Sequence, residues 1–180
     1  PATGAGTTGL GKPLKSILHG NPRIPIYTAS ISPNGLRCAA EVADGVFPMM
    51  VDPENFDVSY LPHLEQGFAK AGGGKSLANF AVLPGVSVIV TDEPEKARMA
   101  VKGGMALYIG GMGARDKNFY NDLAKRLGYE EAAVRIQDLF LAGKKAEATA
   151  AVPDALLDAV HLVGSKDRIR ARLGAWKEAG

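Results

Sequence analysis

The chain has 180 residues, 46% of them hydrophobic, which allows one sizeable core but not two domains. The formal net charge of +2 is small and the basic residues are spread along the sequence, so a dedicated nucleic-acid surface is not expected. The one cysteine, Cys38, excludes an internal disulfide and a cysteine-rich metal site. No apolar run approaches the roughly 20 residues that span a membrane, and the first residues lack the pattern of a signal peptide. These bounds favour a cytoplasmic enzyme without a membrane partner.

Residues 1–15 contain four glycines and three threonines, a composition that predicts a flexible lead-in. The first regular element is expected at residues 24–29, an apolar and β-favouring run typical of a buried strand. Ser32 is suited to cap a helix that begins at Pro33, where a missing N–H does no harm. Apolar residues then recur at helical spacing: Leu36, Ala39, Ala40 and Ala43. A second strand over residues 46–50 completes one βαβ unit of a parallel sheet.

The loop between this strand and this helix, residues 30–33, is the first candidate binding site. In a βαβ unit such a loop lies at the carboxyl edge of the sheet, beside the N-terminus of the helix. The backbone N–H groups of Ile31, Ser32 and Asn34, together with the helix dipole, favour an anion at that place. A plain connecting turn is the alternative, because every βα loop offers some of this geometry.

Beyond the βαβ unit, the sequence predicts a helix over residues 60–71 and a third strand over residues 80–90. Pro84 and Gly85 interrupt the strand, and a proline is awkward at the centre of a sheet. Two interpretations stay open. Either the strand bends at this pair, or a loop precedes a strand that begins at Val86.

The glycine-rich segment 110–113 is the second candidate binding site. It follows a helix that we expect to begin at Asp92 and to end at Gly103–Gly104, and then residues 107–109, which form either the end of a helix or an extended link. Three glycines in four residues let a backbone approach a ligand closely, and Arg115 adds positive charge. The segment is neither a P-loop nor a dinucleotide fingerprint, and a hinge between helices is the alternative. The candidate residues are Gly110, Gly111, Gly113 and Arg115.

The rest of the chain is expected to be helical, over residues 118–127, 130–142, 144–151 and 153–160, with a last helix capped by Ser165. The three histidines, His19, His63 and His161, are far apart in the sequence and no nucleophile elbow accompanies them. No cluster has metal-ligand spacing, so no metal site is predicted, and no catalytic acid or base is assigned. Such a scaffold suits a cofactor that brings its own reactivity.

Three segments carry a family resemblance. Residues 24–47 include Ile-Pro-Ile-Tyr-x-Ala and Ala-Asp-Gly-Val, residues 107–130 include Tyr-Ile-Gly-Gly-Met-Gly, and residues 163–173 begin Val-Gly-Ser-Lys-Asp-Arg. In this order and spacing they resemble the luciferase-like monooxygenase superfamily, and within it the coenzyme F420-dependent oxidoreductases of actinobacteria.

This resemblance implies an α/β fold that is part of a (β/α)8 TIM barrel, with about three strands and the C-terminal helices. Residues 1–180 are then the C-terminal portion of one barrel domain, since a complete barrel takes about 250 residues. We expect such a fragment to be inactive alone. The alternative is a self-standing half-barrel that buries its open edges in an oligomer.

The resemblance also implies a function. The expected protein is an oxidoreductase, a homodimer, that transfers a hydride between the deazaflavin coenzyme F420 and an unidentified small organic substrate. The loop Ala29–Pro33 contacts the cofactor, and the segment Gly110–Arg115 borders the substrate or the cofactor tail. Ala29 and Pro33 match the family pattern, whereas Ser30, Ile31 and Ser32 depart from its small residues. The alternatives are an FMN-dependent monooxygenase of the same superfamily and a non-catalytic degenerate barrel.

Overall fold

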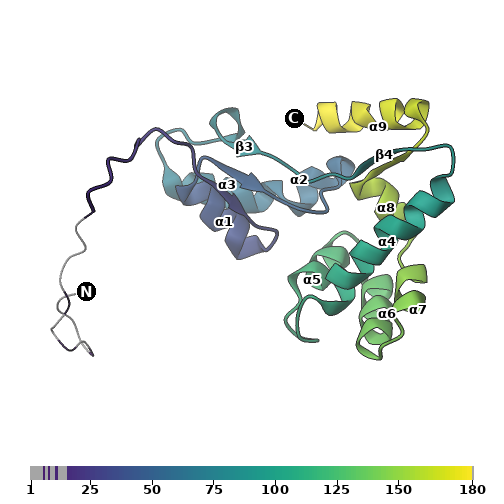
Figure 1. Cartoon of the computed structure of the whole chain (residues 1–180). Helices are drawn as coiled ribbons and strands as arrows, with labels where there is room; N and C mark the ends of the chain where they lie inside the picture. The colour runs from purple at the N-terminus through teal and green to yellow at the C-terminus, as the bar shows by residue number, and fades with distance from the viewer. Residues whose placement is uncertain (1–5, 7, 9–10, 12–15, 180) are drawn as a thin grey trace.

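The computed structural model describes Gly6, Thr8, Gly11 and residues 16–179 of the chain (Figure 1). The flexible lead-in expected over residues 1–15 falls mainly outside these described residues. None of the helices in the described part has the length and the apolar character that crossing a bilayer requires.

The predicted βαβ unit is present and extends to a third strand. Strands β1 (Tyr27–Ala29), β2 (Gly45–Phe47) and β3 (Ala81–Val82) form one parallel sheet in the order β1-β2-β3, with Val46 opposite both Thr28 and Val82. Helix α1 (Pro33–Val42) joins β1 to β2. The connection from β2 to β3 contains η1 (Pro53–Asn55), α2 (Phe56–Ser59), α3 (Leu61–Ala71) and η2 (Leu77–Asn79).

The first strand is shorter and more exposed than the sequence predicts. Ile24 and Ile26 lie before β1 and are 62% and 65% exposed, so the expectation of a buried strand over residues 24–29 is wrong for this part. The reason is that β1 pairs only with β2 among the described strands, which makes it a sheet edge. The backbone is held there by Asp44, whose carboxylate accepts a hydrogen bond of 2.7 Å from the N–H of Ile26.

The predicted third strand is divided between two sheets. Its first part is β3, and its last part is β4 (Val88–Val90), which pairs in parallel with β5 (Leu162–Gly164). Between them Gly85 makes an isolated parallel bridge with Met49, and Pro84 lies in the connection, where no ladder N–H is needed. Strand β5 lies directly before the last helix, at a place where the sequence predicts no strand. Its pairing partner lies more than 70 residues earlier, so local sequence gives no sign of it.

The C-terminal half is helical, as predicted, and Figure 1 shows most of its helices gathered beside the sheet region. The helices are α4 (Pro94–Gly111), α5 (Phe119–Arg126), α6 (Glu130–Leu141), α7 (Lys145–Ala150), α8 (Asp154–Val160) and α9 (Lys166–Glu178). Helix α4 does not end at Gly103–Gly104 but continues for two more turns. Met105, Ala106 and Ile109 are buried beyond these glycines, and their packing outweighs a glycine cost of about 1 kcal/mol each.

The buried residues form one continuous core. At its sheet end, α1 packs against α3 so closely that a Cβ on Gly67 would lie 2.3 Å from the carbonyl oxygen of Arg37. At its helical end, α4 packs against α6 and α7 through fully buried side chains that include Ile109 and Ile136. The core therefore places the sheet and the helical region in contact, and α5 lies where the two meet.

Candidate functional site

A cavity lies at the carboxyl ends of β1 and β2. It measures about 270 Å³ and is lined by the β1–α1 loop, by the segment after β2 and by the start of α5: Ala29, Ser30, Ile31, Ser32, Phe47, Met49, Phe119 and Tyr120. We call it the loop cavity. Four of the five residues predicted to contact a cofactor thus border one cavity. The fifth, Pro33, lines a neighbouring cavity of about 500 Å³.

The loop is ordered by the helix that follows it. The side chain of Ser32 accepts a hydrogen bond of 3.2 Å from the N–H of Gly35, which confirms Ser32 as the N-cap of α1. The carbonyl of Ser32 accepts the first intrahelical bond, from Leu36 at 2.9 Å. Within the described part of the chain, the N–H groups of Ile31 and Ser32 have no hydrogen-bond acceptor. These two donors remain for a ligand.

Helix α5 contributes to the site, although the sequence pattern does not predict a role for it there. Phe119 is 61% exposed and borders both cavities. Its neighbour Tyr120 stacks edge-on against Tyr108 of α4, with 4.7 Å between the ring centroids. This pairing fixes the aromatic wall of the loop cavity.

Two buried asparagines hold α5 in place. Asn118, which is 1% exposed, caps α5 through its side-chain oxygen and donates to the carbonyls of Tyr108 and Ile109 at 3.0 and 2.9 Å. Asn121 donates to the carbonyls of Ile109 and Ala133 at 3.1 and 2.8 Å. The end of α4, the start of α5 and helix α6 are therefore tied together by side chains with no freedom to rotate.

At its last residue, α5 reaches back to the loop. The Nη2 atom of Arg126 donates a hydrogen bond of 2.7 Å to the carbonyl of Ile31. Burial lowers the pKa of Arg126, although the guanidinium remains charged near neutral pH. Arg126 also lines the neighbouring cavity, together with Arg37 and Asp122.

The loop after β2 has its own support. The hydroxyl of Tyr60 donates to the carbonyl of Met49 at 2.9 Å and lies 3.3 Å from the carbonyl of Met50. Burial raises the pKa of Tyr60, so this hydroxyl stays protonated and remains a donor. Met50 has a φ of 55°, a left-handed conformation that is uncommon for a residue with a side chain. Tyr60 thus helps to hold a strained turn at the edge of the loop cavity.

The second candidate segment has a different structure from the one expected. Gly110 and Gly111 belong to the last turn of α4, not to a loop, and a Cβ on either would lie 2.5 or 2.4 Å from the side chain of Phe140. A Cβ on Gly113 would lie 2.3 Å from the carbonyl oxygen of Lys117.

Arg115 forms an ion pair with Asp138 of α6. None of the four candidate residues of this segment lines the loop cavity or its neighbour. Gly110 and Gly111 are therefore helical residues that allow α4 to pack on α6. The ligand contact predicted for Gly110, Gly111, Gly113 and Arg115 stays a prediction.

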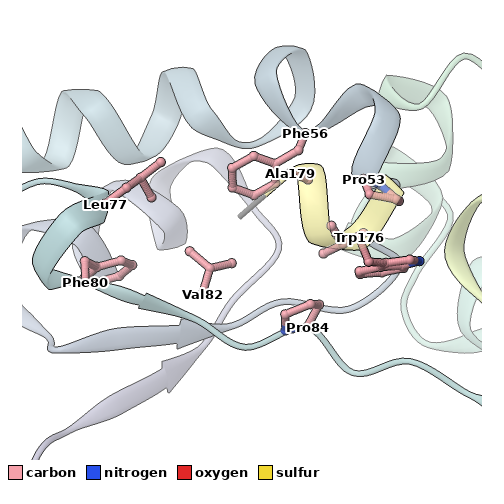
Figure 2. A pocket seen from close by; sticks show the side chains of 9 residues that line it. Pro53, Phe56, Leu77, Phe80, Val82, Pro84, Trp176 and Ala179 are labelled. Atoms are coloured by element: carbon pink, nitrogen blue, oxygen red, sulfur yellow. The ribbon is translucent and has the colours of Figure 1, made fainter. Parts of the chain in front are cut away.

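A third cavity, of about 300 Å³, lies between β3 and the C-terminal helix α9. Figure 2 shows the aromatic and aliphatic side chains around it, with Trp176 of α9 and Ala179, which follows α9, facing Val82 and Pro84. None of its lining residues is ionisable, and none belongs to either candidate segment. Across the described residues, no three His, Cys, Asp or Glu side chains come together in a group that could hold a metal ion.

Comparison with known proteins identifies relatives over almost the whole chain. The sequence profile of the family described as luciferase-like monooxygenase matches residues 6–180. A protein of Mycobacterium tuberculosis named as a coenzyme F420-dependent oxidoreductase is 38% identical, over 100% of this chain and 52% of its own length. A 5,10-methylenetetrahydromethanopterin reductase of Archaeoglobus fulgidus is 28% identical, over 87% of this chain and 46% of its own length. The chain thus spans about half the length of the curated relatives that it matches.

Solved structures show the same relationship. The coenzyme F420-dependent tetrahydromethanopterin reductase from Methanopyrus kandleri has a TM-score of 0.67 and 25% identity, covering 87% of this chain and 43% of that one. An F420-dependent secondary alcohol dehydrogenase, in complex with an F420–acetone adduct, has a TM-score of 0.53 and 16% identity, covering 87% and 41%. The second likeness concerns the fold alone. Together with the parallel strands described above, these matches confirm the predicted fold class, an α/β portion of a luciferase-like barrel.

Proposed function

Since the chain belongs to the luciferase-like monooxygenase family, we propose that its protein is an oxidoreductase that transfers a hydride between coenzyme F420 and a small organic substrate. The observation that carries this proposal is the position of the β1–α1 loop. Residues 29–32 line a cavity at the carboxyl ends of parallel strands, which is where barrel enzymes place their sites. Relatives named as F420-dependent enzymes support the choice of cofactor.

The lining residues fit a flat aromatic ring with an anionic tail. Phe47 and Met49 supply apolar lining that would exclude water from the reacting carbon, and Tyr120 adds an aromatic ring to it. The N–H groups of Ile31 and Ser32, beside the N-terminus of α1, are donors for a phosphate or a ring carbonyl. Bound there, the deazaflavin supplies the hydride carrier, and these residues bind and orient it.

The substrate site and a catalytic acid or base are not assigned to this chain. Because the chain spans about half of its relatives, we propose that activity requires the whole protein and that residues 1–180 alone are inactive. A role for Gly110, Gly111, Gly113 and Arg115 at the substrate or the cofactor tail remains part of the proposal, as do a homodimer and a cytoplasmic location. The competing functions are an FMN-dependent monooxygenase and a non-catalytic degenerate barrel.

The test is cofactor binding by the full-length protein. We would titrate oxidised F420 and FMN separately and follow the cofactor fluorescence together with that of Trp176 and the tyrosines. Micromolar binding of F420 without binding of FMN is the expected result. Binding of FMN alone would favour the monooxygenase, and binding of neither by a folded protein would favour the degenerate barrel.

A further inference from the structure

We propose that Arg126 is a positioning residue for the β1–α1 loop: its guanidinium fixes the peptide group between Ile31 and Ser32 and thereby aims the donors that the loop offers to a ligand. This inference rests on the proposed function for the nature of that ligand. The contact itself does not depend on it. The hydrogen bond from Nη2 of Arg126 to the carbonyl of Ile31 is 2.7 Å long and joins residues 95 positions apart.

The anchor is on a rigid support. Arg126 ends α5, in which Leu123 and Ala124 are fully buried. The start of the same helix is tied to α4 and α6 by Asn118 and Asn121. A side chain on such a helix holds its partner more firmly than one on a mobile loop.

The environment of Arg126 is also unusual for a partly buried arginine, because a carbonyl takes the place of a carboxylate partner. Among the described residues, no carboxylate forms an ion pair with Arg126, and its buried Nε has no hydrogen-bond partner. Asp122, one turn earlier on α5, only contributes a favourable charge nearby. A guanidinium that loses water without gaining a carboxylate depends on its remaining acceptors. The Ile31 carbonyl is the acceptor that the structure provides.

Peptide geometry transmits the effect to the cavity. A trans peptide is planar, so its C=O and the following N–H point in opposite directions. When Arg126 holds the carbonyl of Ile31, it also fixes the direction of the Ser32 N–H, which then points away from Arg126. Apart from the Ser32 cap, the loop has one weak additional restraint, a bond of 3.4 Å from the N–H of Ser30 to the carbonyl of Phe47. Without Arg126, no hydrogen bond within the described part of the chain holds the peptide group between Ile31 and Ser32.

The test uses the full-length protein and three variants. Arg126→Met keeps the apolar stem and removes the donors, and Arg126→Lys keeps a charged donor. Arg135→Met is the matched control, because Arg135 is exposed on α6 and makes no hydrogen bond or ion pair among the described residues. We expect Arg126→Met to weaken F420 binding about tenfold, the size of one lost hydrogen bond from a charged donor, Arg126→Lys to restore part of it, and Arg135→Met to bind like the wild type.

A second measurement tests the anchoring of the loop by Arg126 separately from the proposed binding of F420. Hydrogen exchange in the cofactor-free protein is measured over a peptide covering residues 30–36, and we expect faster exchange in Arg126→Met than in Arg135→Met. If the wild type binds no F420 but this difference appears, the proposed function fails and the anchor stands. If Arg126→Met is folded and exchanges and binds like the wild type, the inference is overturned. Should Arg126→Met not fold, the test uses Arg126→Lys: faster exchange over residues 30–36 together with weaker F420 binding supports the anchor, and exchange and binding like the wild type overturn it.

Discussion

The β1–α1 loop and the end of α4 are both predicted to contact a ligand through their backbone, but the two segments have different surroundings in the structure. In the loop, the N–H groups of Ile31 and Ser32 have no acceptor among the residues that the structure describes, and residues 29–32 border a cavity. At the end of α4, the space beside Gly110 and Gly111 is filled by Phe140. A glycine allows another group to lie close to the backbone, but the sequence does not show whether that group is a ligand or a neighbouring helix.

The two regions also differ in how they are held. The end of α4 is bound by buried side chains on both sides, including Asn118 and Asn121, whereas the loop is held by its helix cap and by Arg126. Functional loops on a rigid scaffold commonly show this contrast. The structure therefore suggests that substitutions at the end of α4 affect folding, and that substitutions in the loop affect binding.

The largest expected effect comes from filling the space beside Phe140. Gly110→Val adds atoms where even a Cβ would lie 2.5 Å from Phe140, so we expect the free energy of unfolding to fall by about 3 kcal/mol. Gly104→Ala is the matched control on the same helix, since nothing lies within 4 Å of a Cβ there, and it should stabilise the protein by up to about 1 kcal/mol. Urea denaturation measures both. Equal stability of Gly110→Val and the wild type would show that Gly110 is not a packing glycine.

A smaller loss is expected from removing a buried amide. Asn118→Ala leaves the carbonyls of Tyr108 and Ile109 without their donor and removes the cap of α5, which should cost about 2 kcal/mol of unfolding free energy. Asn118→Ser keeps a capping oxygen and should recover part of the loss. If the two variants were equally unstable, the cap would contribute nothing. Thermal unfolding followed by circular dichroism provides the comparison.

In the loop, the corresponding change should be mild for stability. Ser32→Ala removes the side-chain acceptor of the Gly35 N–H, with an expected loss of about 1 kcal/mol, while Ser32→Gly should lose only a few tenths. Both variants retain the backbone donors, so F420 affinity should change less than in Arg126→Met. A larger affinity loss in Ser32→Gly than in Arg126→Met would instead assign the ligand contact to the serine hydroxyl.

The sequence predicts the local elements of this fold well and the long-range ones poorly. Ser32 and Pro33 correctly predict the N-cap and the first residue of α1, and the predicted βαβ unit is confirmed. Strand β5 is defined by its pairing with β4, and the continuation of α4 past Gly104 depends on the burial of Ile109. Both depend on tertiary contacts that periodicity does not contain.

In the candidate site, too, the residues with local sequence signals are predicted and those brought in by tertiary contacts are not. Ala29, Ser30, Ile31 and Ser32 are found in the sequence because a βα loop has local signs, and they do line a cavity. Phe119 and Arg126 were missed as members of the site because they reach it from a helix about 90 residues later. A helical pattern assigns such residues to a face of their own helix and says nothing about which loop they meet.

The smallest expected effect concerns pH near the loop. Burial, together with the charges of Arg37 and Arg126, lowers the pKa of His63 on α3, and within the described residues its buried Nδ1 has no hydrogen-bond partner. Below the ordinary histidine pKa of about 6.5, the unfolded chain takes up a proton that folded His63 does not, so stability falls as the pH decreases from 7 to 5. His63→Gln removes this share of the loss, while His161, whose pKa is also lowered by burial, keeps its own share. Melting temperatures measured at pH 7 and pH 5 should therefore differ less in His63→Gln than in the wild type, and an unchanged difference would place His63 in a more hydrated environment than the structure describes.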